Sequence, residues 1–113
     1  MEEIWKDIKG YEGLYQVSNL GNVRKLEEII PTHKITPFMN NNGQLRVSLY
    51  KDKTHKSINV NRLVAEAFIP NEENLRIVGH KDKNNKNNCV DNLFWTNIIN
   101  FKKQIEKEIE DIL

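Results

Sequence analysis

Residues 77–96 read IVGHKDKNNKNNCVDNLFWT, and this stretch decides the fold of the second half of the chain. It opens with a short apolar run at 77–80, continues into a loop at 81–88 that is rich in Asn and Lys, and closes with an apolar run at 93–95. Short apolar runs that flank a polar loop are typical of two strands joined by that loop. The pattern therefore predicts a strand–loop–strand unit with His80 at the end of its first strand.

A helix is expected directly after this unit, over 97–113. Its apolar residues recur at spacings of 3 or 4, the period of an amphipathic helix, at Ile98, Phe101, Ile105, Ile109 and Ile112. Asn100 lies on the first turns, and we expect the domain to cover Ile98 and Phe101 so that Asn100 is held in place. We expect the rest of the apolar face to be covered either by the N-terminal sheet or by a second copy of the chain in a homodimer.

The first part of the chain predicts short strands. Turn residues bound the runs at 4–8 and 14–17, and a further strand is expected at 56–60. Apolar and polar residues alternate over 44–50, which predicts one buried and one solvated face, with Arg46 on the solvated one. These segments predict an N-terminal antiparallel sheet.

A short helix is expected between this sheet and the strand–loop–strand unit. Residues 61–68 have helical spacing, Asn59 or Asn61 is the expected cap, and Pro70 ends the helix. The stretch 31–37, bounded by prolines, is expected to be irregular. The predicted fold class is α+β: an N-terminal antiparallel sheet, a short helix, the strand–loop–strand unit and a long C-terminal helix.

The composition indicates one soluble domain. The chain has 113 residues, of which 38% are hydrophobic and 29% charged. No run is long enough to span a membrane, and the acidic start Met1-Glu2-Glu3 is unlike a signal peptide. Cys89 is the only cysteine, which excludes an internal disulfide and a Cys-based zinc site and fits a reducing cytoplasm.

The net charge of +1 excludes a uniformly basic nucleic-acid coat, but the charge is unevenly spread. Residues 31–70 carry six basic and two acidic side chains and form the only positive third of the chain. Phosphate contact is expected from the basic residues of this third, and the alternative is an ordinary solvated face. The residues are Arg46, Lys51, Lys53, Lys56 and Arg62.

One imidazole and one amide in this pattern have the chemistry of phosphodiester hydrolysis. A neutral imidazole, here His80, can take a proton from water, and an amide oxygen is a ligand suited to magnesium. A base, a water and a metal together suffice to hydrolyse a phosphodiester. By composition alone, however, a single His beside an Asn-rich loop is more often structural.

The order of residues resembles the His-Asn-His/Asn (HNH) nuclease motif of phage and intron-encoded homing endonucleases. The residues that carry the resemblance are His80-Lys81-Asp82, Asn87-Asn88, 91–95 and Asn100, preceded by the helix at 62–70. Residues 4–24 are similar to an N-terminal module that commonly precedes such domains. The resemblance implies one endonuclease domain over 1–113, with the module at 1–30, a hairpin and helix at 43–70, a ββα-metal motif at 75–101 and the C-terminal helix at 97–113.

The resemblance also implies a role for each matching residue. His80 corresponds to the general base, Asn92 to the central Asn that braces the loop and the base histidine, and Asn100 to the final metal ligand. Asp82 corresponds to a loop acid that ties backbone N–H groups. The implied function is a metal-dependent DNA endonuclease that acts on double-stranded DNA with Mg²⁺, or alternatively Mn²⁺. The implied location is the cytoplasm, of a bacterial host if the chain is phage-encoded.

Two residues depart from the family pattern. Gly79 stands where the family usually has an Asp or Asn metal ligand, and Asn61 stands where it usually has a His. The first departure predicts a higher metal requirement, which Gly79→Asp should lower. It also favours an alternative function: a catalytically impaired HNH-like protein that binds DNA or another protein, as a regulator or a phage anti-defence factor.

Overall fold

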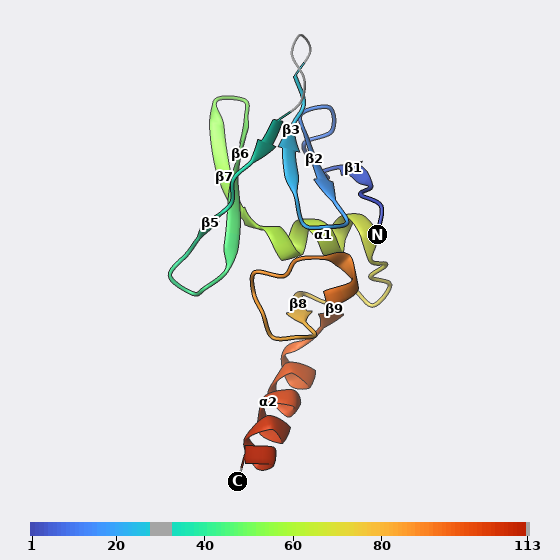
Figure 1. The fold of residues 1–113 in the computed structure, drawn as a ribbon, viewed down its shortest axis with the longest axis vertical. Coiled ribbons are helices and arrows are strands. Elements are labelled where there is room, and N and C mark those ends of the chain that lie inside the picture. Colours follow the sequence, from blue (N-terminus) through green and yellow to red (C-terminus); the bar gives the residue numbers. More distant parts are fainter. Residues whose placement is uncertain (28–32, 113) are drawn as a thin grey trace.

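The computed structural model describes residues 1–27 and 33–112, which form three antiparallel sheets, two α-helices and one short 3₁₀ turn (Figure 1). The first sheet has the order β1-β2-β3-β4, the second β5-β6-β7, and β8 pairs with β9. The elements are β1 (Trp5–Asp7), β2 (Tyr15–Ser18), β3 (Val23–Lys25), β4 (His33–Ile35), β5 (Phe38–Met39), β6 (Leu45–Lys51), β7 (Thr54–Asn59), α1 (Val60–Phe68), β8 (Ile77–His80), η1 (Val90–Asn92), β9 (Leu93–Thr96) and α2 (Ile98–Ile112). The α+β class and the order of its parts are confirmed.

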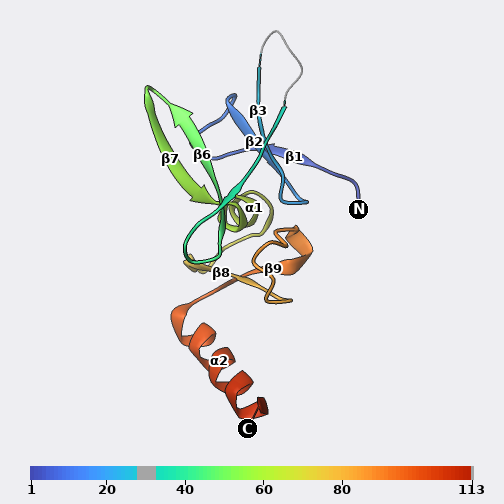
Figure 2. The ribbon, with the colours of Figure 1, turned by 60° about the vertical axis from the view of Figure 1, so that its left-hand side comes forward.

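The helix α1 lies at the centre of the molecule, between the first two sheets and the β8–β9 hairpin (Figures 1 and 2). Its buried face carries Val60, Leu63 and Val64, which pack with Val17 and Leu49 of the sheets in one core. Burial of such side chains contributes about 1.5–3 kcal/mol each. The core therefore fixes the sheets and the hairpin to opposite sides of one helix.

Both ends of α1 lie where the sequence predicts them, to within one residue. Asn59 is the N-cap, but its side chain accepts a hydrogen bond from Arg46 Nη1 at 2.9 Å and does not cap the helix. Asn61 Oδ1 accepts from the N–H of Arg62 at 2.8 Å. The helix ends at Phe68, ahead of Pro70.

The prediction that residues 31–37 are irregular is wrong for residues 33–35. His33–Ile35 forms β4, which pairs with β3 and extends the N-terminal sheet past residue 30. Pro31 lies outside the described residues. The two-residue strand β5 was also not predicted. Both strands are short, and their residues are exposed or half-buried. Two or three residues are too few to show in the sequence the alternation of apolar and polar residues that marks a strand.

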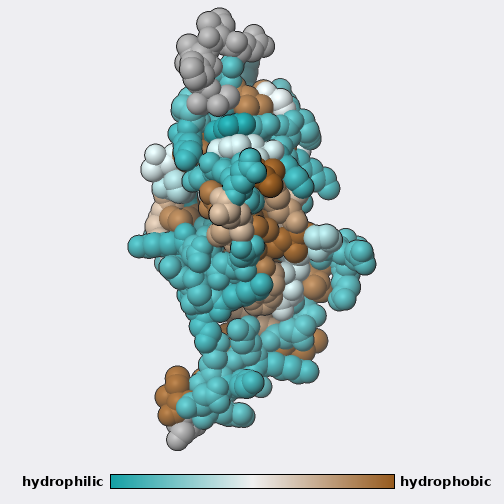
Figure 3. Space-filling model, turned by 45° about the vertical axis from the view of Figure 1, so that its right-hand side comes forward, coloured by the Kyte–Doolittle hydropathy of each residue, from teal (hydrophilic) through white to brown (hydrophobic). Residues whose placement is uncertain are grey.

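The helix α2 projects from the body and gives the molecule its length of 58 Å, against 29 and 27 Å in the other directions (Figures 1 and 2). The expectation that the domain covers Ile98 and Phe101 is wrong: their side chains are 55% and 39% exposed. No residue of α2 is buried, because it follows β9 away from the core. Hydrophobic residues, coloured brown, are exposed at the lower end of the molecule in Figure 3, where α2 ends. Within the described residues, no helix is long and apolar enough to cross a membrane.

Candidate active site

The β8–β9 hairpin places His80 at the edge of the core. His80 is paired with Leu93, and the N–H of Lys81 donates to the carbonyl of Asn92 at 2.8 Å, which closes the polar loop at 81–88. The His80 side chain is only 8% exposed. The strand end therefore holds the imidazole in a fixed, nearly buried position.

One hydrogen bond orients the His80 ring. Its Nε2 lies 2.7 Å from Oδ1 of Asn88, which is itself buried. An amide oxygen only accepts hydrogen bonds, so a proton on Nε2 makes this contact. In the neutral imidazole with that proton, Nδ1 has the lone pair that can accept a proton.

The N-terminal sheet holds Asn88 from the other side. Gly21, in the turn between β2 and β3, has a φ of +87°, and a Cβ there would lie 3.0 Å from the backbone oxygen of Asn88. The N–H of Val90 donates to the carbonyl of Asn19 in the same turn at 2.8 Å. Only glycine allows this approach at that φ. The N-terminal sheet therefore helps to position the residue that orients His80.

Asn92 braces the polar loop. Its Oδ1 accepts from the N–H of Asp82 at 3.0 Å, and its Nδ2 donates to Asp82 Oδ1 and to the carbonyl of Asn87, each at 2.8 Å. Asp82 also accepts from the N–H of Asn84 at 2.8 Å. The bond to the His80 ring comes from Asn88 and not from Asn92, so Asn92 reaches the histidine only through the loop.

The hydrogen bonds around Asp82 make the loop sensitive to acid. The side chain of Asn87, the backbone of Asn84 and the side chain of Asn92 donate to its carboxylate and hold its pKa below the usual range. A group with a lowered folded-state pKa contributes stability above its unfolded pKa of about 3.9 and loses it as the pH falls through the folded value. We expect the Tm of the wild type to fall below about pH 4, and Asp82→Asn to reduce that fall. The control is Asp91→Asn, and an equal effect of both variants would contradict the assignment.

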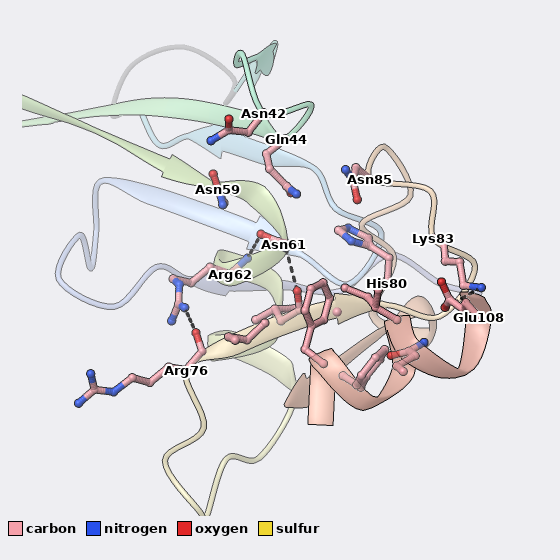
Figure 4. Close-up of a pocket in the computed structure, with 17 residues that line it drawn as sticks. Asn42, Gln44, Asn59, Asn61, Arg62, Arg76, His80, Lys83, Asn85 and Glu108 are labelled. Carbon is pink, nitrogen blue, oxygen red and sulfur yellow. Dashed lines mark hydrogen bonds and ion pairs between the residues drawn. The ribbon is translucent and has the colours of Figure 1, made fainter. Parts of the chain in front are cut away.

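A cavity of about 590 Å³ opens beside His80 (Figure 4). One side carries amide side chains from three different parts of the chain, Asn42, Gln44, Asn59, Asn61 and Asn85. Arg62 and Arg76 bring positive charge to the same space. The cavity therefore offers amide donors near the imidazole, while the positive charge of its two arginines lies at the end away from His80 (Figure 4).

The opposite side of the cavity includes three apolar side chains. Phe94 comes from β9, and Phe101 and Ile105 come from α2. The helix is linked to the polar loop by an ion pair at 2.8 Å between Lys83 Nζ and Glu108 Oε1. The predicted ligand Asn100 is exposed and is not among the residues that line the cavity. The structure thus brings His80 and Asn92 into one unit but leaves Asn100 outside it.

Gly79 has no free space for a side chain. A Cβ at this position would lie 2.5, 2.8 and 3.0 Å from ring atoms of Phe94, its partner across the hairpin. Contacts under 3 Å are not tolerated between carbon atoms, whose optimal separation is about 3.5–4.0 Å. The predicted effect of Gly79→Asp on the metal requirement therefore depends on a shift of the Phe94 ring, whose outer atoms lie in this space.

The two residues to which the resemblance assigns metal binding do not meet at the cavity. In residues 1–27 and 33–112, no group of three or more His, Cys, Asp or Glu side chains is placed to hold a metal ion. Gly79 offers no donor, and Asn100 lies outside the cavity. The two positions that the resemblance assigns to metal binding thus supply no ligand to the space beside His80.

The five basic residues do not form one patch. Arg46 bonds to Asn59 and to the carbonyl of Ser57, and Lys51 Nζ donates to the carbonyl of Gly10 at 2.8 Å. Arg62 lines the cavity and pairs with Glu66 at 3.5 Å. The remaining two, Lys53 at the β6–β7 turn and Lys56, are exposed.

The β6–β7 register divides these residues between two faces. Arg46, Ser48 and Tyr50 lie opposite Asn59, Ser57 and His55 on one face, while Lys56 is opposite Leu49 on the other. The ring centroids of Tyr50 and His55 are 5.3 Å apart, and the ring planes are tilted by 34°. One face of the hairpin therefore carries a polar and aromatic row that leads to the cavity, and Arg46 belongs to it.

Sequence reasoning gave no role to three residues of this site. Asn88 was part of the recognised motif, but its loop is full of Asn residues and nothing local shows which of them meets His80. Arg76 and Phe94 also line the cavity, but the sequence predicted no function for either residue. Phe94 and Trp95 are consecutive residues of β9, so their side chains face opposite sides of the hairpin. Trp95 indeed bonds to the carbonyl of Ile69 at 3.1 Å.

Comparison with known proteins agrees with this geometry. The NUMOD4 motif matches residues 3–50. The chain is 41% identical over 104 residues to the DNA endonuclease I-HmuI of Bacillus phage SP01, which covers 91% of this chain and 58% of the relative. It is 40% identical over 93 residues to an HNH endonuclease of Acanthamoeba polyphaga mimivirus, covering 82% of this chain and 27% of the relative.

A solved structure shares the fold. It describes DNA binding and cleavage by the HNH homing endonuclease I-HmuI, with a TM-score of 0.79 and 41% identity over 96% of this chain and 60% of the other. The chain is thus related in sequence and fold to the HNH homing endonucleases, as the order of its residues predicted. I-HmuI is among these relatives, and the chain carries a NUMOD4 motif at its N-terminus. The chain spans about six tenths of the length of I-HmuI.

Proposed function

We propose that this chain binds double-stranded DNA and hydrolyses a phosphodiester bond at the cavity beside His80. The observation that carries the proposal is the hydrogen bond from His80 Nε2 to Asn88 Oδ1, since it leaves Nδ1 as a proton acceptor. The 41% identity to a DNA endonuclease supports the same reaction and the same substrate class. The phage relative supports a phage origin and action in the cytoplasm of a bacterial host.

In this proposal each residue has a defined task. His80 Nδ1 takes a proton from a water molecule, whose oxygen attacks the phosphorus. The bond from phosphorus to one ester oxygen breaks, and that oxygen takes a proton from solvent and leaves as an alcohol. Asn88 holds the imidazole, and Asn92 braces the loop that carries Asn88. Arg62 and Arg76 provide positive charge for the phosphate. No step of the proposal is routed through the divalent metal that the family implies.

Plasmid nicking tests the function. Supercoiled plasmid is incubated with the wild type and with His80→Ala, each with MgCl₂, with MnCl₂ and with EDTA. Nicking by the wild type that disappears in His80→Ala supports the proposal in any of the three conditions. If the wild type nicks in none of them, or if the variant nicks equally well, the proposal is wrong. The three conditions report separately on the metal requirement.

A second candidate function is DNA binding without cleavage, as a regulator or an anti-defence factor. The contact between Gly79 and Phe94 favours it. The Phe94 ring lies where a side chain at position 79 would begin, and the family resemblance implies a metal ligand at that position. The same assay separates the two candidates. The second candidate predicts retarded plasmid in a gel-shift experiment and no nicking in any condition.

We propose phosphate contacts for Lys53 and Lys56, which are exposed on the β6–β7 hairpin. Each phosphate contact contributes about 0.9 to the slope of log K against log salt. Lys53→Gln combined with Lys56→Gln should weaken binding equally on unrelated duplexes and reduce the slope by up to about 2. The control is Lys102→Gln with Lys103→Gln on α2. An unchanged slope in the hairpin variant would assign both lysines to the solvated surface.

We also propose that two copies pair through α2. The apolar spacing of 3, 4, 4 and 3 is symmetric about Ile105, so that in an antiparallel pair Ile98 faces Ile112 and Phe101 faces Ile109. The side chains of Ile109 and Ile112 are 52% and 84% exposed. Ile109→Asp with Ile112→Asp should convert a dimer into a monomer with the same Tm in sedimentation and melting experiments. A wild type that sediments as a monomer would contradict the proposal.

A further inference from the structure

Lys83 is carried on the same tight turn as His80. The N–H of Lys83 donates to the carbonyl of His80 at 3.1 Å, so the two residues begin and end one turn. Both line the cavity, and Figure 4 shows Lys83 on the His80 side of it, with Arg62 and Arg76 toward the other end. Lys83 therefore brings a positive charge to the imidazole side of the cavity, which the two arginines do not.

The backbone at Lys83 is unfavourable for a lysine. Its φ is +62°, in the left-handed region, where a Cβ is crowded and which glycine and asparagine adopt more readily. Residues held in such a conformation are found preferentially at functional sites. The backbone thus gives no reason for a lysine here, and its side chain is the feature that needs a role.

The Lys83 side chain has a replaceable partner on α2. Its Nζ lies 2.8 Å from Glu108 Oε1, and Glu108 is the one residue of 98–112 that is half-buried and not exposed. The two side chains are 60% and 35% exposed, and an ion pair so open to water contributes little to stability. A phosphate oxygen is an alternative acceptor for the same ammonium group. The carboxylate of Glu108 therefore occupies a position that suits a phosphate.

We infer that Lys83 is the phosphate contact beside His80, and that Glu108 pairs with its ammonium group until DNA replaces the carboxylate. The inference rests on the proposed function and adds a residue to that same site. With DNA bound, the ammonium group stabilises the negative charge that develops on the phosphate as water attacks it. Glu108 competes with DNA, because one ammonium group cannot pair fully with both anions.

DNA binding in EDTA tests the contact without any need for cleavage. Lys83→Gln keeps the left-handed residue but removes its charge, so it should weaken binding to a labelled duplex several-fold. It should also reduce the slope of log K against log salt by about 0.9, the value of one phosphate contact. Lys83→Arg should retain the wild-type slope. The matched control is Lys86→Gln, an exposed lysine of the same loop that is not among the cavity residues, and its slope should equal that of the wild type.

A double-mutant cycle tests the competition. Glu108→Gln should tighten DNA binding several-fold, because the ammonium group is free for the phosphate, and this gain should vanish in the background of Lys83→Gln. Glu110→Gln, the same charge change at an exposed position of α2, should give no comparable gain. Equal gains from Glu108→Gln with and without Lys83 would overturn the inference, as would equal salt slopes for Lys83→Gln and Lys86→Gln.

Melting and nicking separate a phosphate contact from a structural role. Lys83→Gly should melt at or above the Tm of the wild type, since glycine adopts this φ without crowding. A Tm several degrees lower would assign Lys83 to holding the loop and overturn the inference. Nicking at saturating protein should fall in Lys83→Gln by about 10²-fold, the lower end of the range for loss of one charge-stabilising donor. Nicking at the wild-type rate would remove Lys83 from the reacting phosphate.

Failure of this inference is distinct from failure of the proposed function. A wild type that binds DNA exactly as Lys83→Gln does would overturn the role of Lys83 and leave DNA binding in place. A wild type that binds no duplex would overturn both, since every variant would then be equally inactive.

Discussion

His80→Ala should reduce plasmid nicking by about 10²–10⁴-fold while DNA binding stays within a small factor of the wild type. The imidazole acts on water and makes no contact that the proposal assigns to DNA, so its loss removes the base and little affinity. Asn88→Ala should also slow nicking, because His80 Nε2 loses its 2.7 Å partner and the ring is free to change tautomer. Initial rates of plasmid nicking and gel-shift titrations measure the two effects separately.

The matched control for His80→Ala is His33→Ala. His33 is exposed on β4 and pairs with Glu27 at 3.5 Å, away from the cavity. Nicking should be unchanged in this variant. Nicking by His80→Ala at the wild-type rate would remove His80 from the mechanism, and a parallel loss of DNA binding would mean that the variant disturbs the fold and not only the chemistry.

Asn92→Ala should have the largest effect on stability among the site variants. The side chain of Asn92 is 8% exposed and makes three hydrogen bonds within the loop, two to Asp82 and one to the carbonyl of Asn87. With a net contribution of about 0.5–1.5 kcal/mol for each bond, the variant should lose roughly 2–4 kcal/mol of unfolding free energy. Urea titration measures the loss.

Asn41→Ala is the control for this variant, since Asn41 is exposed in the turn between β5 and β6. Its unfolding free energy should match that of the wild type. A variant Asn92→Ala with wild-type stability would show that the polar loop holds its shape without the side chain. Nicking should then be measured as well, because a stable but misplaced loop would still displace Asn88.

Much of the fold could be predicted from local sequence. The strand β8 has the bounds 77–80 that its apolar run predicts, and α1 and α2 lie within a residue of the predicted starts. Periodicity and turn residues are properties of neighbouring positions, so they can be read without tertiary information. The short strands β4 and β5 were missed for the same reason, because their pairing partners and not their own sequence make them strands.

The candidate site was predictable only in part. The order of His80, Asn92 and Asn100 along the chain indicated the family, and the structure places Asn92 where it braces the loop. The position of Asn100 could not be predicted, because it depends on the direction in which α2 leaves β9. That direction is set by packing, and in the structure the first turns of α2 remain exposed.

The sequence by itself determined most of the elements, their order, the family resemblance and the candidate histidine. Tertiary structure alone decided which Asn orients that histidine, since Asn88 is selected by the approach of Gly21 from a sheet far away in the chain. Tertiary structure also decided the surroundings of Gly79. The ring of Phe94, its partner across the hairpin, lies where a side chain at position 79 would begin. The physical reason is that secondary structure follows from contacts between near neighbours, whereas a site depends on contacts that close packing makes between distant segments.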